Sequence, residues 1–311
     1  MHLNPSNNKN LYGYKDLFLT FTNLYKNNFL PNKIIFSGNK GIGKSTFAYH
    51  LINYVFSINE NNKYNLNENA ILDKNNSYKL ISKNVHPNFF LISNDDEKNN
   101  IQVSKIREMI NFTNKSSFNN DPRIILIDNV EYLNINSINA LLKVIEEPNN
   151  NLYFFLVHDS KVKILDTLSS RCIKFNFFLE GNEKEKIIQK ILDDNFYNNL
   201  NNDFRNIYNS PGDLFLLFDF FTKNDIDPGI SIADLLKLII SKKLFKKDMF
   251  IKNNLTFFIE LYFNKKINIF NSKDNVYSFY KYFLNKISDC NKYNLDIENV
   301  LIEFNGKILN G

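Results

Sequence analysis

The feature that most constrains this chain is a glycine-rich segment of eight residues, Gly38-Asn39-Lys40-Gly41-Ile42-Gly43-Lys44-Ser45. The segment fills all four fixed positions of the pattern G-x-x-x-x-G-K-[ST], in which backbone N–H groups turn inward around phosphate oxygens. It follows an apolar run at 33–37 that predicts a buried strand, and it precedes residues 45–56, whose apolar spacing predicts a helix. The chain has nine glycines and three of them fall in this segment, which argues against a chance match.

These residues predict a loop that binds the phosphates of a nucleotide. Lys44 would reach the β- and γ-phosphates, the Ser45 hydroxyl would bind Mg²⁺, and the start of the following helix would add a favourable dipole. The predicted cofactor-binding set is Gly38, Asn39, Lys40, Gly41, Ile42, Gly43, Lys44, Ser45 and Thr46, joined by Asp128. A loop that keeps this shape without binding nucleotide is the alternative.

The chain up to residue 180 alternates between the patterns of strands and helices. Further strands are predicted at 88–92, 123–127, 152–157 and 173–178, and helices at 103–112 and around 138–145, where Pro148 would end the helix. Alternation of this kind predicts a mostly parallel sheet covered on both faces. The Asn-rich residues 59–84 are interpreted as a loose insertion.

After residue 180 the strand pattern fades and helical spacing takes over. Helices are predicted at 182–198, 203–222, 231–245, 247–263, 273–290 and 295–308. The predicted organisation is an α/β nucleotide-binding domain at 1–180, a small helical domain at 181–228, and a helical C-terminal domain at 229–311.

Cysteine and charge limit the remaining classes of site. Two cysteines and four scattered histidines exclude a four-cysteine zinc site, so no zinc is expected. The net charge of +5 lies in residues 229–311, with 13 Lys against 8 acidic residues, and is densest at Lys237–Lys252. That run favours either attraction to nucleic acid or a solvated helix face. With neither a signal peptide nor a membrane-spanning segment in the pattern, a cytoplasmic protein without membrane contact is expected.

The strand at 123–127 ends at Asp128, which a parallel sheet would bring beside the phosphate loop. Asp128 and Ser45 are therefore the predicted holders of Mg²⁺ through the nucleotide. Many ATPases of this design carry Glu directly after this Asp to activate water, but this chain carries Asn129. Loss of a general base costs about 10²–10⁴ in rate. Glu131 could substitute only if the loop bent unusually, so binding of ATP or ADP without efficient hydrolysis is predicted.

Several longer strings carry a family resemblance over residues 3–180. They are Leu11-Tyr12-Gly13-Tyr14, the phosphate loop, His86-Pro87-Asn88-Phe89-Phe90, Asp128-Asn129-Val130-Glu131, Asn139-Ala140-Leu141-Leu142-Lys143-Val144-Ile145-Glu146-Glu147-Pro148 and Ser170-Arg171-Cys172. The chain resembles the clamp-loader branch of the AAA+ ATPases, and within it the delta-prime subunits of bacterial DNA polymerase III. The resemblance implies an α/β AAA+ P-loop domain with a parallel sheet, a helical lid domain and an all-α collar domain for oligomerisation.

The resemblance also implies a role and partners. In the family, the arginine of Ser-Arg-Cys acts in trans as an arginine finger on the γ-phosphate of a neighbouring ATPase subunit, a role that falls here to Arg171. The implied partners are gamma/tau and delta subunits in a pentameric ring that acts in DNA replication. The sliding clamp and primer-template DNA are reached through that complex, and ATP or ADP with Mg²⁺ is the implied cofactor.

Three departures from the ATPase pattern favour a non-motor subunit over a catalytically active gamma/tau-like ATPase, which stays the alternative. They are Asn129, an altered sensor region at Val157-His158-Asp159-Ser160, and Gly212 in Ser210-Pro211-Gly212, where the lid arginine would stand. The zinc module common in these subunits would fall in 57–85, which contains no cysteine. A nucleotide kinase or unrelated nucleic-acid ATPase would leave the Ser-Arg-Cys and Asn-Ala-Leu-Leu-Lys strings unexplained.

Overall fold

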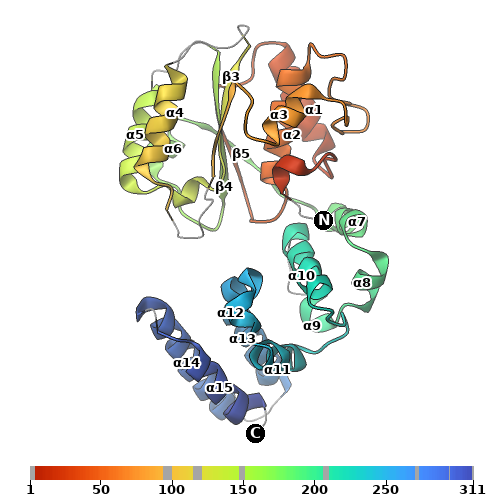
Figure 1. Cartoon of the computed structure of the whole chain (residues 1–311), viewed down its shortest axis with the longest axis vertical. Coiled ribbons are helices and arrows are strands. Elements are labelled where there is room, and N and C mark those ends of the chain that lie inside the picture. The colour runs from red at the N-terminus through yellow and green to blue at the C-terminus, as the bar shows by residue number, and fades with distance from the viewer. Residues whose placement is uncertain are drawn as a thin grey trace. The chain divides into compact units, whose positions relative to one another are not determined.

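The computed structural model describes residues 4–93, 100–114, 121–146, 151–205, 210–269, 273–293 and 295–309. The chain forms two compact units, Met1–Ile187 and Ile188–Gly311. In Figure 1 the first unit is coloured red to green and contains the sheet, and the second is coloured green to blue and is helical. A division of the second unit near residue 228 stays a prediction.

The first unit is built on a five-stranded sheet with the order β2-β3-β4-β1-β5. Each pair of neighbouring strands runs parallel. The strands are β1 (Lys33–Gly38), β2 (Phe89–Ile92), β3 (Arg123–Ile127), β4 (Leu152–Asp159) and β5 (Ile173–Asn176). The apolar runs of β1, β3 and β4 suit strands that are buried on both faces, whereas β5 is mostly exposed. The predicted α/β architecture with a parallel sheet is confirmed.

Helices cover both faces of the sheet (Figure 1). The buried side chains form two apolar cores. One face carries α1 (Lys15–Lys26), α2 (Lys44–Ser57) and α3 (Asn76–Ile81), and the other carries α4 (Val103–Thr113), α5 (Ile135–Glu146) and α6 (Asp166–Ser169). Successive residues of β1 alternate between them: Ile34 and Phe36 enter the first core, and Ile35 enters the second. The carboxyl ends of all five strands therefore meet at one edge, where the phosphate loop begins.

Residues 59–84 are not the loose insertion that their composition predicted. Tyr64, Ile71 and Ile81 are buried in the first core, and the segment contains helix α3. Asn75 is fully buried and its side chain makes three hydrogen bonds: it accepts from the Tyr78 N–H (2.7 Å) and from Asn53 Nδ2 (2.9 Å), and it donates to the Asn62 carbonyl (2.8 Å). The prediction was wrong because an Asn-rich composition does not separate solvated asparagines from those that cap helices and bridge loops.

A buried histidine joins this segment to helix α2. His50 is fully buried; its Nδ1 lies 2.8 Å from the Tyr64 hydroxyl and its Nε2 lies 3.1 Å from the Asn8 carbonyl oxygen. Since the carbonyl can only accept, Nε2 carries the proton and Nδ1 accepts from Tyr64. Burial lowers the pKa of His50 from 6.5 to about 4, against the smaller opposing effect of the Asn8 hydrogen bond.

Acid should destabilise the first unit through this histidine. Its pKa is lower in the folded than in the unfolded chain, so the stabilisation is complete above pH 6.5 and is lost as the pH falls towards 4. Lowering the pH from 7 to 4.5 should cost about 2–3 kcal/mol in free energy of unfolding from His50. Urea denaturation at the two pH values measures this cost. His50→Gln should flatten the pH dependence, and an equally steep dependence in that variant would contradict the assignment.

The second unit contains shorter helices than the spacing predicted. The pattern over 182–198 forms α7 (Gly181–Ile191), which begins in the first unit, and α8 (Asp194–Asn199), because the Asp193 side chain caps α8 by accepting from the Asn195 N–H. The pattern over 231–245 forms α11 (Ile232–Ser241) and α12 (Leu244–Lys247), with Lys243 in the left-handed region between them at φ 54°. The remaining elements are α9 (Asn202–Arg205), α10 (Pro211–Lys223), α13 (Met249–Ile269), α14 (Lys273–Tyr293), α15 (Glu298–Phe304) and a π-helical turn at Asn305–Leu309.

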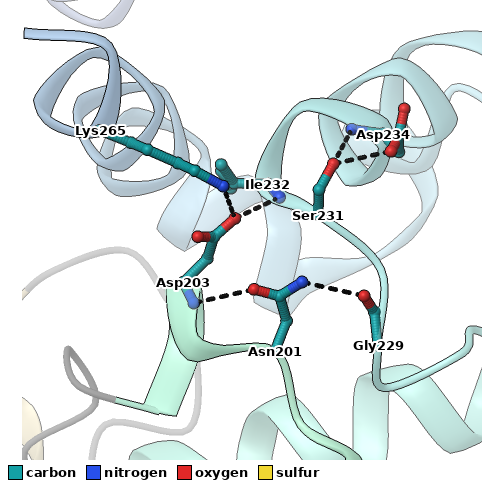
Figure 2. Close-up of polar contacts among 7 residues, drawn as sticks. All are labelled: Asn201, Asp203, Gly229, Ser231, Ile232, Asp234 and Lys265. Atoms are coloured by element: carbon teal, nitrogen blue, oxygen red, sulfur yellow. Dashed lines mark hydrogen bonds and ion pairs between the residues drawn. The ribbon is translucent and has the colours of Figure 1, made fainter. Parts of the chain in front are cut away.

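Polar contacts join the two segments predicted as separate helical domains, as Figure 2 shows. The Asp203 carboxylate accepts from the Ile232 N–H (3.1 Å) at the start of α11 and pairs with Lys265 Nζ (2.7 Å) from α13. Asn201 donates to the Gly229 carbonyl (2.9 Å) and accepts from the Asp203 N–H (3.0 Å). Residues on both sides of 228 are thereby tied into one compact unit, in line with the contact division.

Part of the basic run Lys237–Lys252 is neutralised within the chain. Lys243 pairs with Glu298 (2.6 Å), and Lys246 pairs with Glu298 and with Asp296 (3.4 Å). These lysines lower the pKa of Glu298 to about 2. Two lysines of the run therefore fasten α12 to the start of α15, and contact of the run with DNA stays a prediction. In the described part of the chain, no helix has both the length and the apolar character of a membrane span.

Candidate functional site

The phosphate loop connects β1 to α2 in the conformation that its glycines permit. Gly41 and Gly43 have φ values of 78° and 92°, in the left-handed region that favours glycine. Gly38 is required for a different reason: a Cβ atom there would lie 2.5 Å from the Phe177 carbonyl oxygen and 2.8 Å from a methyl carbon of Ile42. The three glycines of the motif therefore serve backbone geometry, as the sequence predicted.

Residues outside the motif hold the loop in place. The Tyr14 hydroxyl donates to the Ile42 carbonyl (3.0 Å), the Ser160 N–H donates to the Gly38 carbonyl (3.0 Å), and the Ser160 hydroxyl donates to Asn39 Oδ1 (3.1 Å). Burial raises the pKa of the Tyr14 phenol, so it stays a neutral donor. Tyr14 belongs to the Leu11-Tyr12-Gly13-Tyr14 string, and nothing in its residue type or spacing predicts this contact.

Lys44 is buried and turned towards the start of its own loop. Its Nζ donates to the Gly38 carbonyl (2.8 Å) and the Asn39 carbonyl (2.6 Å). Burial lowers the pKa of Lys44, while the carboxylates of Asp159, Glu131 and Asp128 raise it. The ammonium group thus lies where three carboxylates of the strand edge act on it.

Ser45 and Asp128 come together as the sequence predicted. The Ser45 hydroxyl donates to Asp128 Oδ1 at 2.7 Å, although the two residues are 83 positions apart in the chain. Burial raises the pKa of Asp128, whereas the Ser45 hydrogen bond and the charge of Lys44 lower it. A hydroxyl and a carboxylate in contact beside the loop form an oxygen donor pair that suits Mg²⁺.

The loop also offers backbone donors for phosphate oxygens. Within the described ranges, the N–H groups of Gly41, Ile42 and Gly43 donate no hydrogen bond to the backbone or to a side chain. The first turn of α2, which holds Lys44, Ser45 and Thr46, leaves its N–H groups unbonded by helix geometry. An anion would satisfy both sets, so these residues fit a nucleotide phosphate. Of the remaining residues, Lys40 is exposed and Ile42 packs into the first core.

The turn after Asp128 has the unusual bend that Glu131 needs to reach the site. Asn129 takes a left-handed conformation (φ 60°, ψ 64°), and a 3₁₀ turn follows at Val130–Tyr132. This turn brings Glu131 Oε2 to within 3.3 Å of the Asp159 N–H, which donates to it. Glu131 therefore lies at the site, and only the left-handed tolerance of Asn hinted at the bend.

The two residues at the end of β4 have separate roles. His158 is buried; its Nε2 donates to the Val162 carbonyl (2.8 Å) and its Nδ1 accepts from the Ser37 hydroxyl (3.0 Å). That pairing joins β4 to β1 and leaves the imidazole without a nitrogen for a ligand. Asp159 pairs with Gly38 in the strand register and accepts from the Lys161 N–H (3.1 Å).

Arg171 lies at the opposite edge of the sheet from the phosphate loop. It precedes β5, whose Ile173 pairs with Ile34 near the start of β1, whereas the loop begins at Gly38. Four residues of β1 separate these levels, or about 13 Å at ~3.3 Å per residue. The guanidinium donates to Glu146 Oε1 from Nε (2.7 Å) and NH2 (2.6 Å), and to the Thr167 carbonyl from NH1 (2.8 Å).

The contact between Arg171 and Glu146 joins the Ser-Arg-Cys string to the string that begins at Asn139. Glu146 ends α5 in the Asn-Ala-Leu-Leu-Lys string, and its pairing with Arg171 was not predicted. Glu147 and Pro148, which complete that string, lie outside the described residues. Cys172 is half-buried, and burial raises the pKa of its thiol to about 11, which suits a packing residue and not a reactive one.

The Ser210-Pro211-Gly212 string begins α10. The buried Ser210 hydroxyl accepts from the Asp213 N–H (3.1 Å), and Pro211 occupies the first helical position. Gly212 lies in the first turn, so this position carries no cationic side chain.

The comparisons with a family model and with known proteins agree on one family. The family model described as DNA polymerase III, delta subunit matches residues 13–179. The chain is similar to a DNA polymerase III subunit delta-prime of Buchnera aphidicola subsp. Baizongia pistaciae, with 26% identity over 87% of this chain and 75% of that protein. A delta-prime subunit of Buchnera aphidicola subsp. Schizaphis graminum is 37% identical over 35% of this chain and 33% of its own length.

A DNA polymerase III gamma subunit of Buchnera aphidicola subsp. Acyrthosiphon pisum is 27% identical over 58% of this chain and 47% of its own length. Similarity to a gamma subunit thus covers less of the chain than similarity to the first delta-prime subunit. The family model spans more than half of the chain, so this protein belongs to the DNA polymerase III delta subunit family, as a delta-prime-like member.

Proposed function

We propose that this chain is a non-motor subunit of a sliding-clamp loader and supplies Arg171 to the ATP site of a neighbouring subunit. One observation carries the proposal: Arg171 lies on the sheet edge opposite its own phosphate loop, about 13 Å or more from it along β1. An arginine so placed can serve a nucleotide only on another chain. Assembly of the complex with Arg171→Ala tests this role through the ATP turnover of the complex.

The pairing with Glu146 suits such a role. Both side chains of this ion pair are partly exposed, at 37% for Arg171 and 49% for Glu146. Exposed ion pairs stabilise a fold by about 0–1 kcal/mol, so Arg171 can exchange this partner for a phosphate at little cost. Its planar guanidinium can contact two phosphate oxygens at once, which an ammonium group cannot do. Glu146 would orient the arginine before the neighbour arrives.

The chain's own phosphate loop is proposed to bind nucleotide without efficient turnover. Gly38 to Thr46 would hold the phosphates, and Ser45 with Asp128 would hold Mg²⁺, which would supply charge neutralisation. Asn129 replaces the residue that would take a proton from water, and its side chain cannot act as a base. Gly212 stands where the resemblance places the lid arginine of family ATPases, and it carries no positive charge.

A second candidate is a catalytically active gamma/tau-like ATPase subunit. One observation favours it: the bent turn after Asp128 brings the Glu131 carboxylate to the site. Glu131 is however engaged by the Asp159 N–H, which orients it along the strand edge. Under the non-motor proposal, Glu131→Gln leaves the ATP turnover of the complex unchanged. Under the second candidate, the same substitution lowers it by about 10²-fold or more.

Nucleotide titration of the isolated protein tests its own site. We expect measurable binding of ADP or ATP with Mg²⁺ and negligible hydrolysis. Lys44→Ala should weaken binding by about 10- to 100-fold, because it removes a charge-assisted contact worth about 1.5–3 kcal/mol. Lys15→Ala, at the start of α1, is a matched control. If no binding is detected at millimolar nucleotide, the loop has kept its shape and lost its ligand.

A further inference from the structure

Two carboxylates that the Mg²⁺ pair does not include lie at the phosphate site. Asp159 ends β4 at the level of Gly38, where the phosphate loop begins. Glu131 lies against it, because Glu131 Oε2 accepts from the Asp159 N–H at 3.3 Å. Both are partly buried. Within the described ranges neither carboxylate forms an ion pair that would neutralise it.

Both carboxylates act electrostatically on Lys44. Lys44 is the residue of this motif that would reach the β- and γ-phosphates of a bound nucleotide. The Ser160 N–H, next to Asp159, already donates to the Gly38 carbonyl, which holds the end of β4 against the loop. The carboxylates of Asp159, Glu131 and Asp128 raise the pKa of Lys44, and the ammonium group of Lys40 lowers it.

We propose that Glu131 and Asp159 make this phosphate loop selective for nucleoside diphosphates over triphosphates. The proposal rests on the nucleotide binding proposed above and concerns which nucleotide the site accepts. A triphosphate adds a negatively charged phosphoryl group beyond the β-phosphate, beside two carboxylates. A diphosphate ends before it. Charges in a partly buried site are poorly screened, so this repulsion falls on the triphosphate alone.

The structure also explains why the arrangement is stable without a nucleotide. Glu131 is fixed by the Asp159 N–H, and Asp159 Oδ1 accepts from the Lys161 N–H (3.1 Å). The isosteric changes Asp159→Asn and Glu131→Gln keep an oxygen for each of these hydrogen bonds. They remove one charge each and leave the loop shape unaltered, so they isolate the electrostatic contribution.

Calorimetric titration of the full chain with MgADP and with MgATP at matched ionic strength measures the selectivity. We expect the wild-type Kd for MgADP to be about tenfold or more below that for MgATP. Asp159→Asn should tighten MgATP binding about tenfold and change MgADP binding by less than about threefold, and Glu131→Gln should act in the same direction. Asp121→Asn is the matched control, because Asp121 precedes β3 and so lies at the opposite edge of the sheet from Asp128.

Equal or tighter binding of MgATP by the wild type would overturn the proposal, and so would a selectivity that both substitutions leave unchanged. Either result would leave nucleotide binding at this loop intact. If neither nucleotide bound at all, selectivity and nucleotide binding would fail together. The role of Arg171 would still stand, because it is measured on the neighbouring subunit.

Discussion

Replacing Arg171 by Ala should lower the ATP turnover of the assembled clamp loader by about 10³-fold or more. Arginine fingers are worth ~10³–10⁵ in rate, because they stabilise charge that develops on the γ-phosphate in the transition state. The proposed role in trans rests on the place of Arg171 just before β5, at the edge opposite its own phosphate loop. Steady-state ATP hydrolysis by complexes assembled with wild-type or variant subunit measures the effect.

Two further variants sharpen this measurement. Arg171→Lys should restore little of the rate, because lysine lacks the planar fork. Arg107→Ala is the matched control, because Arg107 is an exposed arginine on α4 and its loss should leave turnover unchanged. Turnover that stays within about threefold of wild type in the Arg171→Ala complex, with assembly shown to be intact, would contradict the role in trans.

Replacing Phe47 by Ala should cost about 3–5 kcal/mol in free energy of unfolding of the first unit. Phe47 is fully buried two residues after Ser45, and its ring lies 4.9–6.2 Å from the ring centroids of five other aromatic residues, Tyr14, Phe18, Phe21, Phe36 and Phe177. Truncation would remove these contacts and leave a cavity below the phosphate loop.

Urea denaturation gives this loss directly. Phe29→Ala is the matched control, because Phe29 is 75% exposed and its truncation should change the stability by less than about 0.5 kcal/mol. A loss below about 1 kcal/mol for Phe47→Ala would show that the neighbouring rings close the cavity, and that they do not form a rigid support for the loop.

Most of the sheet could be predicted from sequence because β1, β3 and β4 are largely continuous apolar runs, whereas β5 alternates apolar and polar residues. The runs of β1 and β3 lead into the phosphate loop and into Asp128, the partner of Ser45. Parallel topology follows from the helices between strands, and it brings residues 83 positions apart into contact.

Contacts that depend on tertiary geometry could not be predicted from residue type and spacing in the sequence. The Asn-rich segment 59–84 looked solvated, yet Asn75 is fully buried with hydrogen bonds to three residues. The position of Glu131 depends on the left-handed conformation of Asn129, which a sequence permits without requiring. The helical spacing likewise continued across Asp193 and Lys243, so it predicted single helices there. In the structure a new helix begins after each residue, because the Asp193 side chain caps α8 and Lys243 takes a left-handed conformation before α12.

The pairing of Arg171 with Glu146 is another contact that depends on tertiary geometry. The two residues are 25 positions apart and come from strings with no shared periodicity. Their contact arises because α5 ends, and β5 begins, at the same edge of a parallel sheet. The sequence predicted the arginine, and only the fold shows that the chain's own phosphate loop lies at the other edge of the sheet.

The measurement that tests the central claim most directly is the ATP turnover of a clamp loader assembled with the Lys44→Ala subunit. If this chain serves its neighbour and does not hydrolyse ATP itself, turnover should stay within about twofold of the wild-type complex, while Arg171→Ala in parallel abolishes most of it. A collapse of turnover with Lys44→Ala, at unchanged assembly, would contradict the account and identify the chain as a motor subunit.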